Sequence, residues 1–124
     1  MPDVPPSPPT RPLPQSDQTP DAMSIAVASA RAMWENDRAS SGLGMKLERV
    51  EPGGAVMSMT VTEAMVNGHG ICHGGFIFLL ADSSFAFACN SHGQRAVAQS
   101  AQISFLAPAR LGMTLVAEAR ALSC

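Results

Sequence analysis

Two glycines and one carboxylate near the middle of the chain could do chemistry together. Gly74 and Gly75 open a long apolar segment, and the first N–H groups of a helix have no acceptor inside it. An approaching oxygen atom can accept hydrogen bonds from such amides. Asp82 follows two helical turns later among apolar residues, where an unpaired carboxylate is costly to bury. This pattern favours a catalytic role for Asp82; the alternative is a structural carboxylate that caps or bridges.

Other arrangements of reactive side chains have less support. The sequence presents no Ser-His-Asp or Cys-His alternative, and Cys72 is either a reactive thiol near a helix start or a small packing residue. Zinc sites have characteristic ligand spacings. The histidines and cysteines that lack such spacing are His69, Cys72, His73, Cys89 and His92. We therefore predict no metal site and no cofactor.

The composition indicates one small domain that associates with itself. The chain has 124 residues, of which 46% are hydrophobic and 15% charged, and its mean hydropathy is +0.11. Because about 25% charged residues is usual, we expect another copy of the chain to cover part of the apolar surface. The net charge of −2 and the scattered basic residues argue against a nucleic-acid binder.

Nothing in the sequence is typical of export or of membrane insertion. No apolar run reaches the roughly 18 residues that would span a bilayer. The N-terminus lacks the charged start and the apolar core of a signal peptide. Three cysteines without paired spacing predict no disulfide framework. We therefore expect a cytoplasmic protein that does not enter the membrane.

Proline separates a tail from the domain. Residues 1–21 hold eight of the ten prolines, which predicts a disordered or polyproline-like tail, or alternatively a proline-motif ligand for a partner domain. Residues 22–124 form the domain. Asp21 is a plausible N-cap for a helix over 22–36, and serines and glycines at 40–44 break that pattern. The sequence Pro52-Gly53-Gly54 predicts a hairpin between strands 45–51 and 55–62.

A central helix and two further strands complete the predicted fold. The segment from Gly74 to about Asn90 is apolar on nearly all sides, which is typical of a buried helix. Strands over 95–107 and 113–122 follow, joined by a turn at 108–112. This order predicts an α+β fold in which an antiparallel sheet wraps around the central helix. The chain ends within the pattern of the last strand, so we expect the last strand or strands of the fold to be missing.

The central motifs resemble those of a known enzyme family. Residues 65–69, 72–75, 80–83 and 88–91 read MVNGH, CHGG, LADS and ACNS, and 103–108 reads ISFLAP. Over residues 22–122 the chain resembles the hot-dog-fold acyl-CoA thioesterases of the phenylacetate-degradation (PaaI) type. The resemblance implies hydrolysis of acyl-CoA, typically phenylacetyl-CoA or its ring-hydroxylated relatives, by a homodimer or homotetramer. Members of that family continue for another strand or two.

The resemblance also implies roles for individual residues. Asp82 is the catalytic carboxylate, acting either as a nucleophile or as a general base on water, and the Gly74 amide donates to the thioester carbonyl. Asn67 helps to position the carbonyl or the water, and His73 shapes the turn that holds the amide. The candidate substrate-binding residues are Gly75, Phe76 and Phe85. Core packing is the alternative for the aromatic side chains.

The separation of Gly74 and Asp82 predicts a site shared between two chains. Eight helical residues span roughly 12 Å, whereas a donor and a nucleophile acting on one carbonyl each come within about 3 Å of it. We therefore expect Gly74 and Asn67 of one protomer to face the partner's Asp82. The alternatives are a non-catalytic hot-dog protein that binds acyl-CoA or only oligomerises, and a hot-dog dehydratase or hydratase, which usually needs a histidine with a carboxylate.

Overall fold

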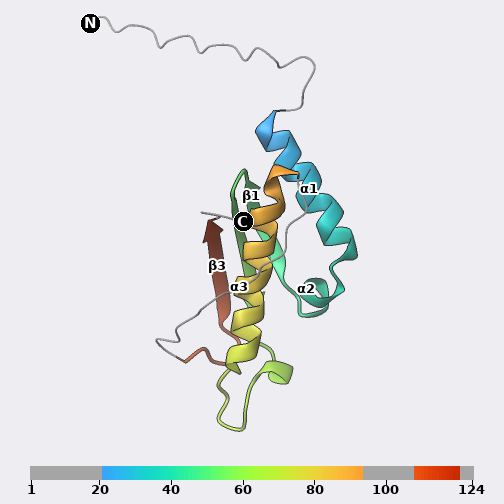
Figure 1. Ribbon diagram of the computed structural model, residues 1–124. Helices are drawn as coiled ribbons and strands as arrows, with labels where there is room; N and C mark the ends of the chain where they lie inside the picture. Colours follow the sequence, from blue (N-terminus) through green and yellow to red (C-terminus); the bar gives the residue numbers. More distant parts are fainter. Residues whose placement is uncertain (1–20, 94–107, 121–124) are drawn as a thin grey trace, which may run out of the picture.

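The computed structural model describes residues 21–93 and 108–120. In chain order the elements are α1 (Ala22–Asn36), α2 (Arg38–Gly42), β1 (Lys46–Glu51), β2 (Gly54–Thr60), the 3-10 turn η2 (Glu63–Met65), α3 (Gly74–Cys89), the 3-10 turn η3 (Asn90–His92) and β3 (Thr114–Arg120). Within these residues the strands form one antiparallel sheet in the order β1-β2-β3. Helix α3 lies along one face of this sheet, and α1 packs beside them (Figure 1). The predicted α+β class is confirmed.

The predicted hairpin is present, with slightly different strand ends. Glu51 pairs with Gly54 across the turn, where Gly53 adopts a φ of +78°, a conformation that favours glycine. The register shifts between Leu47 and Arg49, which places a bulge in β1. Strand β2 lies between β1 and β3 and so forms the middle of the described sheet.

The core lies between β2 and α3. Alternate residues of β2 and its extension face the helix and are at most 3% exposed: Ala55, Met57, Met59 and Val61. The buried residues of α3 are Leu80, Ser83, Ser84, Phe87, Ala88 and Cys89, and all but Cys89 lie on one stripe. Among the described residues, the other positions of the helix are half-buried or, at Gly75, exposed. As far as Ala88, α3 is therefore buried on one face and not all round in this part of the chain.

Capping carboxylates begin both N-terminal helices. Helix α1 has the predicted bounds, and Asp21 Oδ1 accepts a hydrogen bond from the Ser24 N–H at 2.7 Å, which lowers the pKa of Asp21. The predicted break at 40–44 is instead partly helical. Asp37 accepts hydrogen bonds from both the N–H and the hydroxyl of Ser40, and that hydroxyl lies 2.8 Å from Ser83 Oγ. A cap and a buried contact to α3 thus stabilise a short helix that local propensity disfavours.

Several expectations fall elsewhere. The predicted strand over 95–107 and residues 1–20 of the tail lie outside the described residues, and β3 falls within the predicted strand 113–122.

The cysteines differ from the expectation of no disulfide framework. Cys89 is disulfide-bonded, whereas Cys72 is a buried free thiol. A disulfide joins residues that only the tertiary fold brings together, so spacing gave no signal. Within the described ranges, no helix is long and apolar enough to cross a membrane.

Candidate active site

The loop before α3 is built around the side chain of Asn67. Its Oδ1 atom accepts hydrogen bonds from the N–H groups of His69 at 2.8 Å and Ile71 at 3.1 Å. Gly70, at a φ of +76°, closes the turn by donating its N–H to the Asn67 carbonyl at 3.0 Å. Because two donors meet one side-chain atom, that atom is the amide oxygen, and Nδ2 is left without an acceptor among the described residues.

The same loop is tied to two other parts of the chain. The Cys72 N–H donates to the carbonyl of Ala109 at 2.7 Å, and the Leu111 N–H donates to that of Gly70 at 3.3 Å. The His73 N–H donates to the Met65 carbonyl at 2.8 Å. The turn at 108–112 was predicted from sequence, but its role as a support for the loop was not. These bonds hold the start of α3 in place from both sides.

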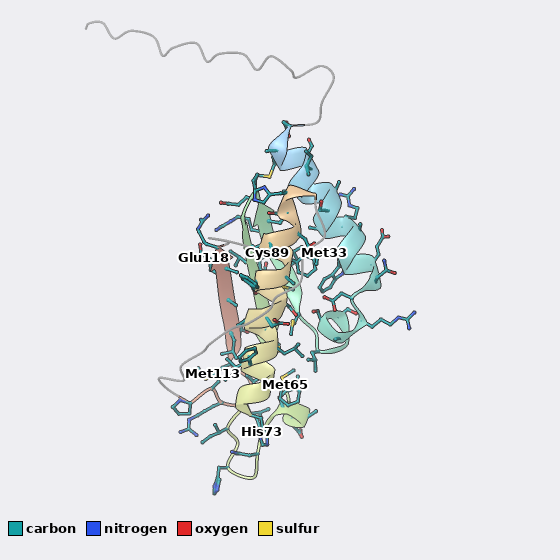
Figure 2. All side chains as sticks on the ribbon, in the orientation of Figure 1. Met33, Met65, His73, Cys89, Met113 and Glu118 are labelled. Carbon is teal, nitrogen blue, oxygen red and sulfur yellow. The ribbon has the colours of Figure 1, made fainter. Side chains whose placement is uncertain are left out.

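The first amides of α3 are open. His73 is the N-cap residue, its side chain is exposed at the loop end of the helix (Figure 2), and it makes no capping hydrogen bond. The amides of Gly74 and Gly75 therefore find no acceptor within the described part of the chain. Gly75 is exposed, and the space where its Cβ would lie is empty out to 4 Å. A ligand oxygen can thus approach these amides at the positive end of the helix dipole.

Asp82 lies on the face of α3 that points away from the sheet. It is about 200° around the helix from Leu80, at 100° per residue, and Leu80 is buried against the sheet. The carboxylate is half-buried, and it forms no hydrogen bond or ion pair with any residue in the two described ranges. The alternative that Asp82 is a structural carboxylate, capping a helix or bridging two elements, therefore has no support within this part of the chain.

The aromatic candidates separate onto different faces of α3. Around the helix axis, Phe85 lies about 60° and Phe78 about 40° from Asp82. Both therefore lie on the same face of α3 as Asp82, together with Gly75. Phe76 lies about 120° away and packs against the hydrophobic core. The structure therefore places Phe85 beside the carboxylate and turns Phe76 toward the sheet. Phe78, like Phe85, is half-buried on this face.

Gly74 and Asp82 are not brought together within one chain. Helix α3 runs from Gly74 to Cys89 without interruption, so the eight residues between them keep a separation of about 12 Å along the axis. A donor and an attacking group for one carbonyl each lie within about 3 Å of it, so this separation disfavours a site made by one chain. The expected sharing of the site between two chains is consistent with this geometry and stays a prediction.

Other nucleophiles and metal ligands are poor candidates. Burial raises the pKa of the Cys72 thiol, which disfavours the reactive thiolate. Among residues 21–93 and 108–120, no three histidine, cysteine, aspartate or glutamate side chains are grouped so that they could hold a metal ion.

The loop geometry separates two roles of Asn67. We expect Asn67→Ala to destabilise the loop by about 1–3 kcal/mol, because the exposed His69 N–H and the half-buried Ile71 N–H each lose a hydrogen bond of about 0.5–1.5 kcal/mol. Amide hydrogen exchange at His69 and Ile71 measures this loss. Asn67→Asp keeps an oxygen for both donors but removes the Nδ2 donor. It should preserve slow exchange while lowering the rate of CoA release, and an unchanged rate would show that Asn67 only supports the loop.

Comparison with known proteins gives a consistent result. A family model of the thioesterase superfamily matches residues 69–123. The acyl-coenzyme A thioesterase PaaI of Escherichia coli K12 is 50% identical over 95 residues, which are 77% of this chain and 68% of that enzyme. The solved PaaI protein from the E. coli phenylacetic acid degradation operon superposes with a TM-score of 0.78 at 47% identity, covering 81% of this chain and 72% of that one.

A third relative was solved with a ligand. A protein of Streptococcus mutans UA159, bound to acetyl CoA, is 29% identical with a TM-score of 0.61, and the match covers 64% of each chain. The chain thus spans about two thirds of the length of these relatives. The fold of the described residues, a central helix on an antiparallel sheet, is the hot-dog fold of these neighbours. The chain belongs to the PaaI-type acyl-CoA thioesterases of the thioesterase superfamily.

Proposed function

We propose that the protein hydrolyses aryl-acetyl-CoA thioesters, such as phenylacetyl-CoA, to the free acid and CoA. The observation that carries the proposal is the presence on α3 of open amides at Gly74 and Gly75 and of a half-buried carboxylate, Asp82, that has no partner among the described residues. Thioester hydrolysis needs both groups, because negative charge develops on the carbonyl oxygen while a nucleophile attacks the carbonyl carbon.

Each group has a defined task in this reaction. The Gly74 amide donates a hydrogen bond to the carbonyl oxygen as the tetrahedral intermediate forms, and loss of one such donor typically costs about 10²–10³ in rate. The partner's Asp82 either attacks the carbonyl carbon or removes a proton from the attacking water. When Asp82 acts as the base, the carbon–sulfur bond breaks, and Asp82 returns the proton taken from water to the CoA thiolate. When Asp82 acts as the nucleophile, CoA leaves as the thiolate, and water then hydrolyses the acyl–Asp82 anhydride to the free acid, with the released proton going to the thiolate. We assign to Nδ2 of Asn67 a hydrogen bond to the carbonyl or the water.

A dimer is part of the proposal. The spacing of about 12 Å along α3, at 1.5 Å per residue, supports assigning the amides and the carboxylate of one site to two chains. The half-buried apolar face of α3 around Asp82 supplies a surface that a second copy can cover. Pairing of two dimers into a tetramer is equally compatible with the spacing.

The acyl group is inferred from relatives and from the aromatic side chains near Asp82. The E. coli PaaI relative comes from a phenylacetic acid degradation operon, and the S. mutans relative binds acetyl CoA. Phe78 and Phe85 lie on the Asp82 face of α3 and are half-buried. Aromatic rings pack well against a phenyl group, so we propose an aryl-acetyl chain in preference to a short aliphatic one.

A CoA-release assay tests the proposal. Free thiol is measured with phenylacetyl-CoA, acetyl-CoA and octanoyl-CoA, and the highest kcat/KM is expected for phenylacetyl-CoA. Binding of phenylacetyl-CoA without thiol release would favour a non-catalytic acyl-CoA-binding protein. Turnover of a 2-enoyl-CoA without thiol release would favour a hydratase. Either result, or no release above the uncatalysed rate from any of the three thioesters, contradicts the proposal.

A further inference from the structure

A groove unrelated to the α3 site runs between α1 and β1. It is open to solvent and has a volume of about 460 Å³. Its walls are formed by Val27, Arg31 and Trp34 of α1 and by Lys46, Leu47 and Val50 of β1. Its floor is apolar, because Ala30 and Met45 beneath it are 4% and 3% exposed. Strand β1 is at one edge of the described sheet, so the groove follows that edge.

The groove continues to the beginning of α1. A second hollow of about 340 Å³ shares Val27 and Arg31 with the first and extends to Asp21 and Met23. Two apolar side chains along this path are unusually exposed, Met23 at 49% and Val27 at 38%. The path therefore begins at Asp21, which is also the residue where residues 1–20 join the helix.

We propose that the N-terminal segment, residues 1–20, turns back along α1 and docks in this groove. The distance is short. From Asp21 to Trp34 the helix rises about 20 Å, at 1.5 Å per residue. A polyproline II chain covers about 3.1 Å per residue, so roughly seven residues cross the groove and twenty would extend about 62 Å. Leu13, the eighth residue back from Asp21 and flanked by a proline on each side, then reaches the far end of the groove at Trp34, about 25 Å along such a chain.

The chemistry of the segment matches that of the groove. Proline-rich chains in the polyproline II form dock in grooves lined by aromatic and apolar side chains, and Trp34 supplies the aromatic wall. Asp17, about 12 Å from Asp21 along such a chain, comes level with Arg31, about 15 Å along α1. Neither Arg31 nor Lys46 forms an ion pair with any residue that the structure describes.

Because residues 1–20 are covalently joined to α1, even a shallow groove can hold them. A segment joined directly to α1 binds at an effective concentration in the millimolar range. The ordering of the segment opposes docking, but no entropy of association is lost. Docking covers the exposed side chains of Met23 and Val27 and shields the neighbouring strand edge.

Trp34 reports on the docking, because it is the only tryptophan of the chain. We expect the full chain to show a blue-shifted Trp34 emission and a lower acrylamide quenching constant than a chain that starts at Asp21. Far-UV circular dichroism verifies that the shortened chain is folded. A peptide of residues 1–20, added at millimolar concentration, should shift the emission of the shortened chain back toward that of the full chain.

Point variants in the tail test the register without disturbing the domain. Leu13→Ser and Asp17→Arg should each raise the quenching constant, the second by placing two cations side by side. Arg31→Asp combined with Asp17→Arg should restore protection. The matched controls are Val4→Ser and Asp3→Arg, which lie beyond the roughly seven residues that cross the groove, and these should leave quenching unchanged.

Two results overturn the proposal. Equal emission and equal quenching in the full and shortened chains would mean that the segment does not cover Trp34. Protection that grows with protein concentration would mean that the segment of a second copy occupies the groove. Activity plays no part in these measurements, so they stand apart from any outcome for the thioesterase proposal.

Discussion

Replacement of Asp82 by asparagine is expected to reduce the rate of CoA release by about 10²–10⁴-fold, the range typical of a lost general base. Asparagine has nearly the same size and is tolerated at a half-buried position, but it can neither accept a proton at neutral pH nor form an acyl-enzyme. Because the proposed carboxylate acts in the transition state, the loss should fall on kcat, with KM little changed.

The matched control for Asp82 is an exposed carboxylate away from α3. Glu35 on α1 is exposed and forms no ion pair with any described residue, so Glu35→Gln should leave kcat within twofold (about 0.4 kcal/mol). Identical rates for wild type, Asp82→Asn and Glu35→Gln would remove Asp82 from the mechanism. If Asp82→Asn instead lowers the melting temperature and the lost activity follows from the unfolded fraction, Asp82 has a structural role.

The second large effect is a rescue of activity by mixing two inactive variants. Gly74→Pro removes the N–H that we assign to the carbonyl, yet proline is well accepted at the first position of a helix. The backbone of His73, at φ −61° and ψ 137°, already has the extended conformation that precedes proline. We expect Gly74→Pro alone to lose about 10²–10³ in rate, and Gly74→Ala, which keeps the amide, to lose much less.

Mixing Gly74→Pro with Asp82→Asn then tests whether the site is shared. A mixed dimer contains one intact site, built from the Gly74 amide of one chain and the partner's Asp82, and one site without either group. After complete exchange of equal amounts, about one quarter of the wild-type sites are intact. Native mass spectrometry verifies the exchange. If mixed dimers form and remain inactive, both groups act from the same chain.

Local signals account for the parts of the fold that sequence predicted well. Asp21 before an uninterrupted helical pattern defines α1 at the predicted bounds, because a cap and the first turn involve residues three apart. The Gly74 start of α3 follows from a glycine pair in front of a long apolar run. Pro52-Gly53 marks the hairpin, since its turn needs a positive φ. Each of these features depends on neighbours in the chain.

Contacts between distant segments of the chain produced the features that the sequence did not predict. Helix α2 depends on a hydroxyl contact between Ser40 and Ser83, which are 43 residues apart. The Asn67 loop is held by Ala109 and Leu111 from the other end of the domain.

The amino-acid sequence by itself determined which groups could react: the asparagine in the loop before α3, and the glycine amides and the aspartate on that helix. Only the tertiary structure decided where they point. Packing of Leu80 and Phe87 against the sheet turned Phe76 inward and left Asp82 facing outward. Composition alone cannot set that rotation, because a helix that is apolar on nearly all sides can bury any face. Its orientation is chosen by the shape of the surface it packs on.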